Sequence, residues 1–270
     1  MSKEVFNLWG KVPGMCEEVP HITVYTPDVK KGNGAVVIFP GGGYCARAPH
    51  EGEGYAEYLC EIGLTAFVVD YRVAPHKHPI PLADARRGVQ FARYYADKYG
   101  IDKNKIAVMG SSAGGHLAAS ASTYFENLEL ELEEDEISKE CYIPNAQILC
   151  YPVIMLYGKG KGHIGSGINL LGENLPEMGE ELSPNNNVNE NTPQAFIWHT
   201  FEDDCVNVVN SLEYAKELKN ANKDCEMHIY PHGRHGLGIC APSDKLQTHV
   251  RQWADAMAKW LEYIDFIGRV

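Results

Sequence analysis

The sequence predicts an α/β protein with a mainly parallel, doubly wound sheet and helices on both faces. Short apolar runs recur along the chain, and between them lie longer segments with the apolar spacing of amphipathic helices. With 270 residues, 44% of them hydrophobic, the chain is long enough to bury one large core. No internal repeat, low-complexity linker or abrupt change in composition divides it, so we expect one domain over residues 1–270.

The predicted strands are short runs that end at proline, glycine or acidic residues. An alternating, half-exposed strand is expected at 21–26, after an irregular lead-in over residues 1–20. The later runs are mostly apolar, which is typical of the buried strands of a parallel sheet. They cover residues 35–39, 64–72, 105–109, 147–151, 195–200 and 227–230.

Helices are expected where apolar residues recur at a spacing near 3.6. The clearest is an amphipathic helix from Pro79 to Tyr99, with Leu82, Val89 and Phe91 on its apolar face. Further helices are expected up to residues 58–59, at 115–122, at 211–219 and, closing the chain, at 246–264.

Two segments interrupt this alternation. Residues 126–140 hold eight acids among fifteen residues and are interpreted as a solvated, mobile surface insertion, although leucine and glutamate alternate as in a strand. Residues 153–192 show little periodicity and are interpreted as a cap-like excursion. Asp70 and Arg72 are expected to form a structural ion pair.

The charge balance and the cysteine spacing exclude several classes of protein. A formal net charge of −12 disfavours nucleic acid and anionic membranes as partners. No secretion signal and no apolar run of the ~18 residues that a membrane span needs are present, so we expect a cytoplasmic protein. The eight cysteines form no C-x-x-C pair and are expected to be buried free thiols. No metal or nucleotide motif occurs, so neither a metal nor a cofactor is expected.

Residues 110–114, Gly-Ser-Ser-Ala-Gly, carry the strongest chemical signal. They lie between the apolar run 105–109 and the small-residue helix 115–122, and G-x-S-x-G between a strand and a helix indicates a nucleophile elbow. The glycines let the chain turn sharply enough to hold the Ser112 hydroxyl above the sheet. Ser112 is therefore the candidate nucleophile, and a glycine-rich turn without chemistry is the alternative.

A second glycine-rich turn follows the strand predicted at 35–39. Three consecutive glycines leave backbone N–H groups without side chains in the way, as stabilisation of an oxyanion requires. We expect the N–H groups of Gly42 and Gly43 to form an oxyanion hole with that of Ala113, at the N-terminus of the helix after the elbow. A merely flexible turn is the alternative.

A serine hydroxyl needs a neutral imidazole to take its proton and a carboxylate to orient that imidazole. Downstream of Ser112, an acidic cluster over residues 202–204 follows a predicted strand, and its three members are the candidate acids. Of the four later histidines, His235 lies on a glycine-flanked loop after the last strand and is the best placed. The order serine, acid, histidine is that of hydrolases with a nucleophile elbow.

Together these stretches resemble the α/β-hydrolase carboxylesterases of the acetyl-xylan and feruloyl esterase type, which are related to the hormone-sensitive-lipase-like esterases. The matching stretches are residues 39–44, 70–75, 108–117, 182–184, 198–200 and 235–238. In this family the acid lies in an Asp-x-x-Val unit, here Asp203 to Val206, so the resemblance selects Asp203. Pro40 stands where lipase-like relatives carry a histidine, and Asn207 where a proline usually follows the valine.

The resemblance implies a serine hydrolase that removes short acyl groups, acetyl above all, from xylo-oligosaccharides or related sugars. An amidase or peptidase of the same fold and a non-catalytic binding protein are the alternatives. Tyr44 directly follows the three glycines, so its ring is expected close to the bound ester. Glu51 comes soon after and is expected on a polar rim, which makes both residues candidates for substrate binding.

Overall fold

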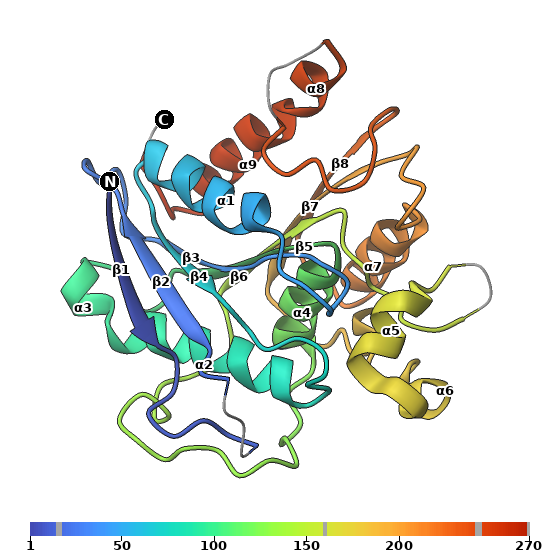
Figure 1. Cartoon of the computed structure of the whole chain (residues 1–270). Coiled ribbons are helices and arrows are strands. Elements are labelled where there is room, and N and C mark those ends of the chain that lie inside the picture. The colour runs from blue at the N-terminus through green and yellow to red at the C-terminus, as the bar shows by residue number, and fades with distance from the viewer. Residues whose placement is uncertain (15–17, 159–160, 241–244, 269–270) are drawn as a thin grey trace.

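The computed structural model describes residues 1–14, 18–158, 161–240 and 245–268. An eight-stranded sheet with the order β1-β2-β4-β3-β5-β6-β7-β8 runs through the molecule (Figure 1). From β4 to β8 all neighbouring strands are parallel, which confirms the predicted fold class. The strands are β1 (Ser2–Asn7), β2 (His21–Thr26), β3 (Ala35–Phe39), β4 (Thr65–Val69), β5 (Ile106–Ser111), β6 (Ala146–Cys150), β7 (Gln194–Thr200) and β8 (Cys225–Tyr230).

The irregular lead-in expected over residues 1–20 is wrong, because it contains the edge strand β1. β1 pairs antiparallel with β2, from Ser2 opposite Thr26 to Asn7 opposite His21. Its residues are almost all exposed, so the strand lacks the apolar run by which the other strands were found. Backbone pairing with β2 holds this edge strand in place.

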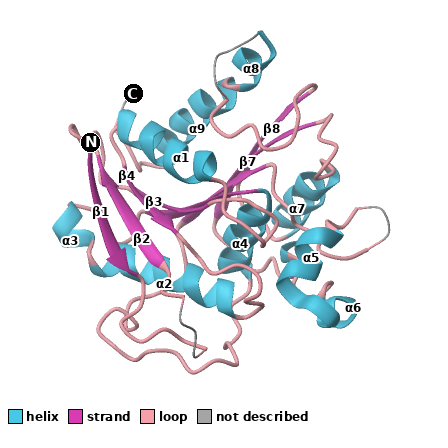
Figure 2. Ribbon diagram, viewed as in Figure 1, coloured by secondary structure: helices cyan, strands magenta, loops and turns pink. Residues whose placement is uncertain are grey.

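Helices cover both faces of the sheet (Figure 2). Alternate residues of β3 enter the two cores: Val37 and Phe39 pack with α2, α4 and α7, and Val36 and Ile38 with α1 and α9. The helices are α1 (Pro49–Glu61), α2 (Ile80–Tyr94), α3 (Ala96–Tyr99), α4 (Ser112–Thr123), α5 (Ile164–Leu171), α6 (Leu175–Met178), α7 (Val209–Asn220), α8 (Lys245–Val250) and α9 (Gln252–Tyr263), with short 3₁₀ turns at Gly172–Asn174 and Pro184–Asn186. Within the described ranges, no helix has the length and apolar character to cross a bilayer, and the cytoplasmic location stays a prediction.

Two helices predicted as continuous are each divided in the structure. The first breaks at Tyr95, whose ring packs on Phe91 at 4.5 Å and on Phe6 of β1 at 6.1 Å between ring centroids. The closing helix breaks at Arg251, whose guanidinium donates to the carbonyl groups of Ile239 and Cys240. In both cases a tertiary contact fixes the turn, which a helical period in the sequence does not reveal.

The acidic segment 126–140 is a loop, as interpreted, and within it no strand is present. The expectation that it is a mobile surface insertion is wrong in one respect, because buried arginines of α2 fasten it. The Arg87 guanidinium makes a bidentate ion pair with the Asp135 carboxylate, with N–O distances of 2.7 and 2.5 Å. The Glu133 carboxylate accepts from the backbone N–H groups of Gly10 and Lys11, so the segment also fixes the chain between β1 and β2.

The expected pair of Asp70 with Arg72 is wrong. Arg72 is fully buried, and its guanidinium bonds Asp84 of α2 at 2.7 and 2.9 Å. Asp70 instead lies 3.9 Å from Arg47 at the surface. β4 ends at Val69, so both residues lie beyond the strand, and the same-face spacing of residues i and i+2 in a strand does not apply to them.

The cysteines of the described part of the chain are free thiols, as expected. The expectation that they are buried holds for Cys60, Cys150 and Cys240 but not for Cys45, Cys141 or Cys205, which are exposed, while Cys225 is intermediate. Cys16 lies outside the described residues.

Candidate active site

Three side chains from distant parts of the sequence meet at the carboxyl edge of the parallel strands. Ser112 begins α4 after β5, Asp203 follows β7, and His235 lies on the loop after β8. The Ser112 Oγ is 2.8 Å from Nε2 of His235, and Nδ1 of His235 is 2.7 Å from Oδ2 of Asp203. This hydrogen-bonded series can move a proton away from the serine hydroxyl, which is what a nucleophile of that kind needs.

The backbone holds Ser112 in an unusual conformation. Its φ of 53° lies in the left-handed region, which residues other than glycine rarely adopt. A Cβ atom on Gly114 would lie 2.0 Å from the carbonyl oxygen of Phe39, so a side chain there would push α4 away from β3. The glycine therefore lets the elbow pack directly on the end of β3, where the glycine-rich loop begins.

That glycine-rich loop passes beside the serine. A Cβ atom on Gly41 would lie 3.1 Å from Cβ of Ser112. Gly42 and Gly43 have φ values of 135° and 63°, conformations that favour glycine. Neither N–H group donates a hydrogen bond to another described residue. Ala113 directly follows Ser112, and Gly42 and Gly43 directly follow Gly41, so these three residues remain the candidates for the oxyanion hole.

Hydrogen bonds hold both oxygens of the Asp203 carboxylate. Oδ1 accepts from the N–H groups of Cys205 and Val206 at 3.0 and 2.8 Å. Oδ2 accepts from His235 and lies 3.3 Å from Nε2 of His199. Burial alone would raise the pKa of Asp203, but the hydrogen bonds from His199 and His235 outweigh it, and the pKa lies well below its ordinary value. The group is thus a carboxylate at neutral pH, the form that orients an imidazole.

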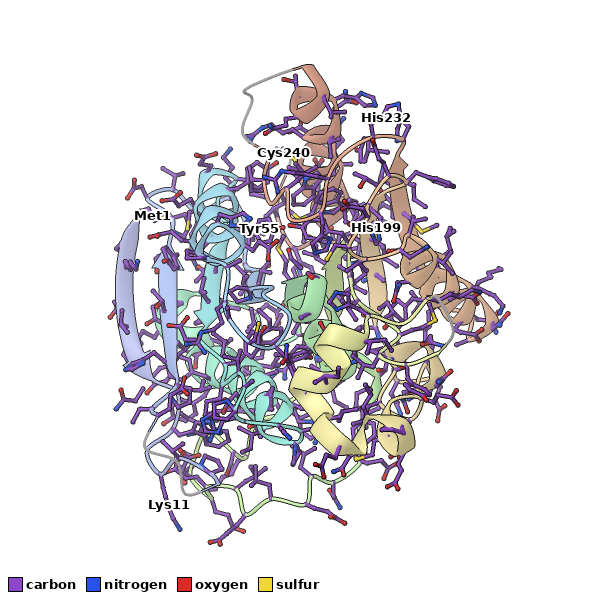
Figure 3. The ribbon with its side chains drawn as sticks, turned by 45° about the vertical axis from the view of Figure 1, so that its right-hand side comes forward. Met1, Lys11, Tyr55, His199, His232 and Cys240 are labelled. Carbon is purple, nitrogen blue, oxygen red and sulfur yellow. The ribbon has the colours of Figure 1, made fainter. Side chains whose placement is uncertain are left out.

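Sequence reasoning missed His199, which contacts the Asp203 carboxylate in addition to His235. It lies on β7 (Figure 3) and is fully buried. Its Nδ1 is 2.8 Å from Oγ of Ser211 and its Nε2 is 2.9 Å from the carbonyl oxygen of Val206. A histidine at the end of an otherwise apolar strand, just before the acidic cluster, was the signal that could have found it.

Of the four histidines that follow the acidic cluster, His235 is the one that the structure brings to Ser112. His228 lies on β8, His232 lies on the exposed chain after β8 (Figure 3), and His249 is on α8. The glycine-flanked loop after β8 brings His235 back over the sheet edge to Ser112. A histidine within β8 or α8 is held in its own strand or helix and does not reach the serine.

The structure corrects the two candidates for substrate binding. Tyr44 is 1% exposed, and its hydroxyl is 2.8 Å from Nδ1 of His116, so its ring is a core element rather than a wall of an open site. Glu51 is 3% exposed and does not stand on a polar rim. Its two oxygens accept from the N–H of Gly41 and from the hydroxyl of Tyr151. Tyr44 lies in the turn after the three glycines and Glu51 in the first turn of α1, and both side chains are buried.

The excursion over residues 153–192 borders the site through α5. The amide of Asn169 donates to the carbonyl oxygen of Gly43 at 2.8 Å. His163, just before α5, lies 3.7 Å from the sulfur of Cys205 on the acid loop. The excursion therefore touches both the glycine-rich loop and the acid loop. Among the described side chains, no group of three or more histidine, cysteine or acidic residues could hold a metal ion.

Comparison with known proteins shows which family and which enzymes this chain is similar to. The BD-FAE family model matches residues 22–218. The chain is 37% identical over 231 residues to Endo-1,4-beta-xylanase B of Butyrivibrio fibrisolvens, and 35% identical over 211 residues to an acetylxylan esterase of Xylanibacter ruminicola. These matches cover 82% and 76% of this chain but 35% and 41% of the relatives, so the chain spans less than half the length of either.

Among solved structures, an acetyl ester-xyloside bifunctional hydrolase from Caldicellulosiruptor lactoaceticus is similar over almost its whole length. It has a TM-score of 0.89 and 42% sequence identity, covering 98% of this chain and 97% of that one. The resemblance to α/β-hydrolase esterases is thereby confirmed, and the acetylxylan esterase and the acetyl ester-xyloside hydrolase are of the expected enzyme class, the carboxylic ester hydrolases. The chain belongs to the BD-FAE family and has the α/β-hydrolase fold.

Proposed function

We propose that the chain is a serine carboxylesterase that removes acetyl groups from sugar hydroxyls, such as those of xylo-oligosaccharides. Ser112 Oγ attacks the ester carbonyl carbon while Nε2 of His235 takes the hydroxyl proton. The same nitrogen gives this proton to the leaving sugar oxygen, so the C–O bond breaks and an acyl-serine remains. Water, deprotonated by His235, then attacks the acyl carbon. The bond from that carbon to Ser112 Oγ breaks, His235 returns the proton to Oγ, and acetic acid is released.

The remaining groups orient His235 and stabilise the charges that develop during the reaction. Asp203 holds the tautomer of His235 whose Nε2 is free to accept, and it stabilises the imidazolium that forms. The N–H groups of Gly42, Gly43 and Ala113 stabilise the negative oxygen of the tetrahedral intermediate. These donors are backbone groups of two glycines and of the first turn of α4, so they need no rearrangement as the charge develops.

One observation carries this proposal: the 2.8 Å contact between Ser112 Oγ and His235 Nε2, made by a serine held at a left-handed φ. A serine that served only packing would not require a disfavoured backbone conformation beside a hydrogen-bonded imidazole and carboxylate. The sugar-ester substrate is supported by the relatives, whose names include an acetylxylan esterase and an acetyl ester-xyloside hydrolase.

The acyl-chain preference tests the substrate class. We expect kcat/KM to be highest for p-nitrophenyl acetate and to fall through butyrate to octanoate. A long acyl chain needs an apolar shelter, where each buried methylene contributes about 0.8 kcal/mol. The α-helices described within the excursion are the short α5 and α6, of eight and four residues. Initial rates over the ester series provide the measurement.

Acetate release from acetylated xylo-oligosaccharides is the second arm, and the unacetylated oligosaccharides are its control. An amide analogue of the acetyl ester is run in parallel and is expected to turn over far more slowly. A preference for octanoate, or no acetate from any acetylated sugar, would contradict the sugar-ester proposal and leave the roles of Ser112 and His235 untouched.

A further inference from the structure

Glu51 connects the two loops that carry the proposed chemistry, although it takes part in no step described so far. It lies in the first turn of α1 and is almost fully buried. Its Oε2 accepts from the N–H of Gly41 at 2.9 Å, and its Oε1 accepts from the Tyr151 hydroxyl at 2.7 Å. Its ion-pair neighbour within the described residues is His50, 3.9 Å away and largely exposed. Hydrogen-bond donors thus stabilise this buried acid.

Tyr151 carries the connection to the loop of His235. The N–H of Gly238 donates to the Tyr151 oxygen at 2.9 Å, so the phenolic proton is directed to Glu51. Burial and the nearby Glu51 charge hold the pKa of Tyr151 well above its ordinary value, so the hydroxyl keeps this proton. The ring of Tyr151 packs on the imidazole of His235 at 5.1 Å between centroids and 70° between planes. The hydroxyl of Tyr55, a residue of α1 (Figure 3), lies 3.2 Å from the same phenolic oxygen.

Gly41 carries the connection to the oxyanion loop. A Cβ atom on Gly41 would lie 2.4 Å from Oε2 of Glu51 and 3.1 Å from Cβ of Ser112. The backbone of Gly41 is therefore enclosed between the carboxylate and the serine. Gly42 and Gly43 follow directly, so any displacement of Gly41 also displaces the N–H groups proposed to stabilise the oxyanion.

We propose that Glu51 is a positioning residue that fixes the oxyanion loop and the His235 loop relative to each other, through Gly41 and Tyr151. This inference rests on the proposed function. A carboxylate accepts from both donors at once, whereas an amide has one acceptor oxygen and presents N–H groups to the other donor. Replacement of Glu51 therefore releases one of the two loops and leaves every reacting group in the chain.

The kinetic consequence follows from when the oxyanion exists. The negative oxygen forms in the transition state and not in the bound substrate. Loss of the hydrogen bonds that stabilise it therefore lowers kcat and leaves KM unchanged. We expect Glu51→Gln to lower kcat for p-nitrophenyl acetate by roughly 10²-fold, the scale of a small misplacement of catalytic groups. The affinity for a trifluoromethyl ketone, which forms a tetrahedral adduct with the serine, should fall by the same factor as kcat/KM.

The matched control is Glu57→Gln, the same change at an exposed position of the same helix, and it should keep the wild-type kcat. Tyr151→Phe keeps the ring against His235 but removes the hydroxyl, and we expect a smaller loss of kcat. When Tyr151→Phe is combined with Glu51→Gln, it should lower kcat little further, because both changes break the same connection between the two loops. Tyr151→Phe also carries the test if Glu51→Gln fails to fold.

Wild-type kcat in a folded Glu51→Gln, or a loss confined to KM or to thermal stability with unchanged ketone affinity, would overturn the positioning role. If Glu51→Gln does not fold, wild-type kcat in Tyr151→Phe overturns it instead. A failure of the proposed function looks different. In that case the wild-type chain itself hydrolyses no ester, and a fluorophosphonate leaves Ser112 unlabelled.

Discussion

Ser112→Ala is expected to abolish ester hydrolysis, with a loss of kcat of roughly 10⁶-fold, the effect of removing a nucleophilic serine from such a triad. Without Oγ, no acyl-serine can form, and the hydrogen bond to Nε2 of His235 is lost. Binding should survive, because the change removes a single oxygen. Turnover of p-nitrophenyl acetate and the mass of the protein after fluorophosphonate treatment measure the effect.

The neighbouring serine provides the control. Ser111 lies at the end of β5, is fully buried, and its hydroxyl is 2.6 Å from that of Tyr55. Ser111→Ala should cost about 1 kcal/mol of stability through this hydrogen bond and leave most of the esterase activity. A phosphonate adduct on Ser111, or full activity in Ser112→Ala, would show that the motif positions a different residue.

Asp203→Asn has the second largest expected effect, a loss of kcat of roughly 10⁴-fold. The amide cannot accept from both His235 and the backbone N–H groups of Cys205 and Val206 as the carboxylate does. An asparagine amide turned toward Nδ1 of His235 favours the tautomer with the proton on Nε2, which cannot accept from Ser112. Steady-state kinetics with p-nitrophenyl acetate measure the loss.

Asp204→Asn is the matched comparison, because it makes the same change one residue away. Asp204 is exposed, whereas Asp203 is held at both oxygens, so we expect Asp204→Asn to keep most of the activity. Equal losses in the two variants would mean that the acid loop exchanges one aspartate for the other during the reaction.

The sequence predicted those features that depend on local pattern. Apolar runs located the parallel strands, and a glycine-bounded serine after one of them located the elbow. The acid needed more, since residues 202–204 look equivalent by pattern alone. The family resemblance selected Asp203, and in the structure Asp203 is bonded to His235. Asn207 stands where the resemblance led us to expect a proline, and its side-chain oxygen accepts from the N–H of Val209 and so fixes the start of α7.

Features that depend on distant partners were missed. Glu51 reads as a polar surface residue because its donors, Gly41 and Tyr151, lie 10 and 100 residues away along the chain. Arg72 was assigned to Asp70, two residues before it, although its partner Asp84 stands on the next helix. A pattern of single residues contains no information on such pairs, since burial of charge is decided only when elements pack.

The position of β8 at the edge of the sheet has a consequence for biosynthesis. Ser112 and Asp203 leave the ribosome before His235, and the strand that leads to His235 joins the sheet last at its outer side. At about 5–20 residues per second, the nascent chain carries the serine for several seconds before the histidine is made. The elbow can fold during that interval, but its hydroxyl stays unactivated until synthesis has almost reached the end of this sequence.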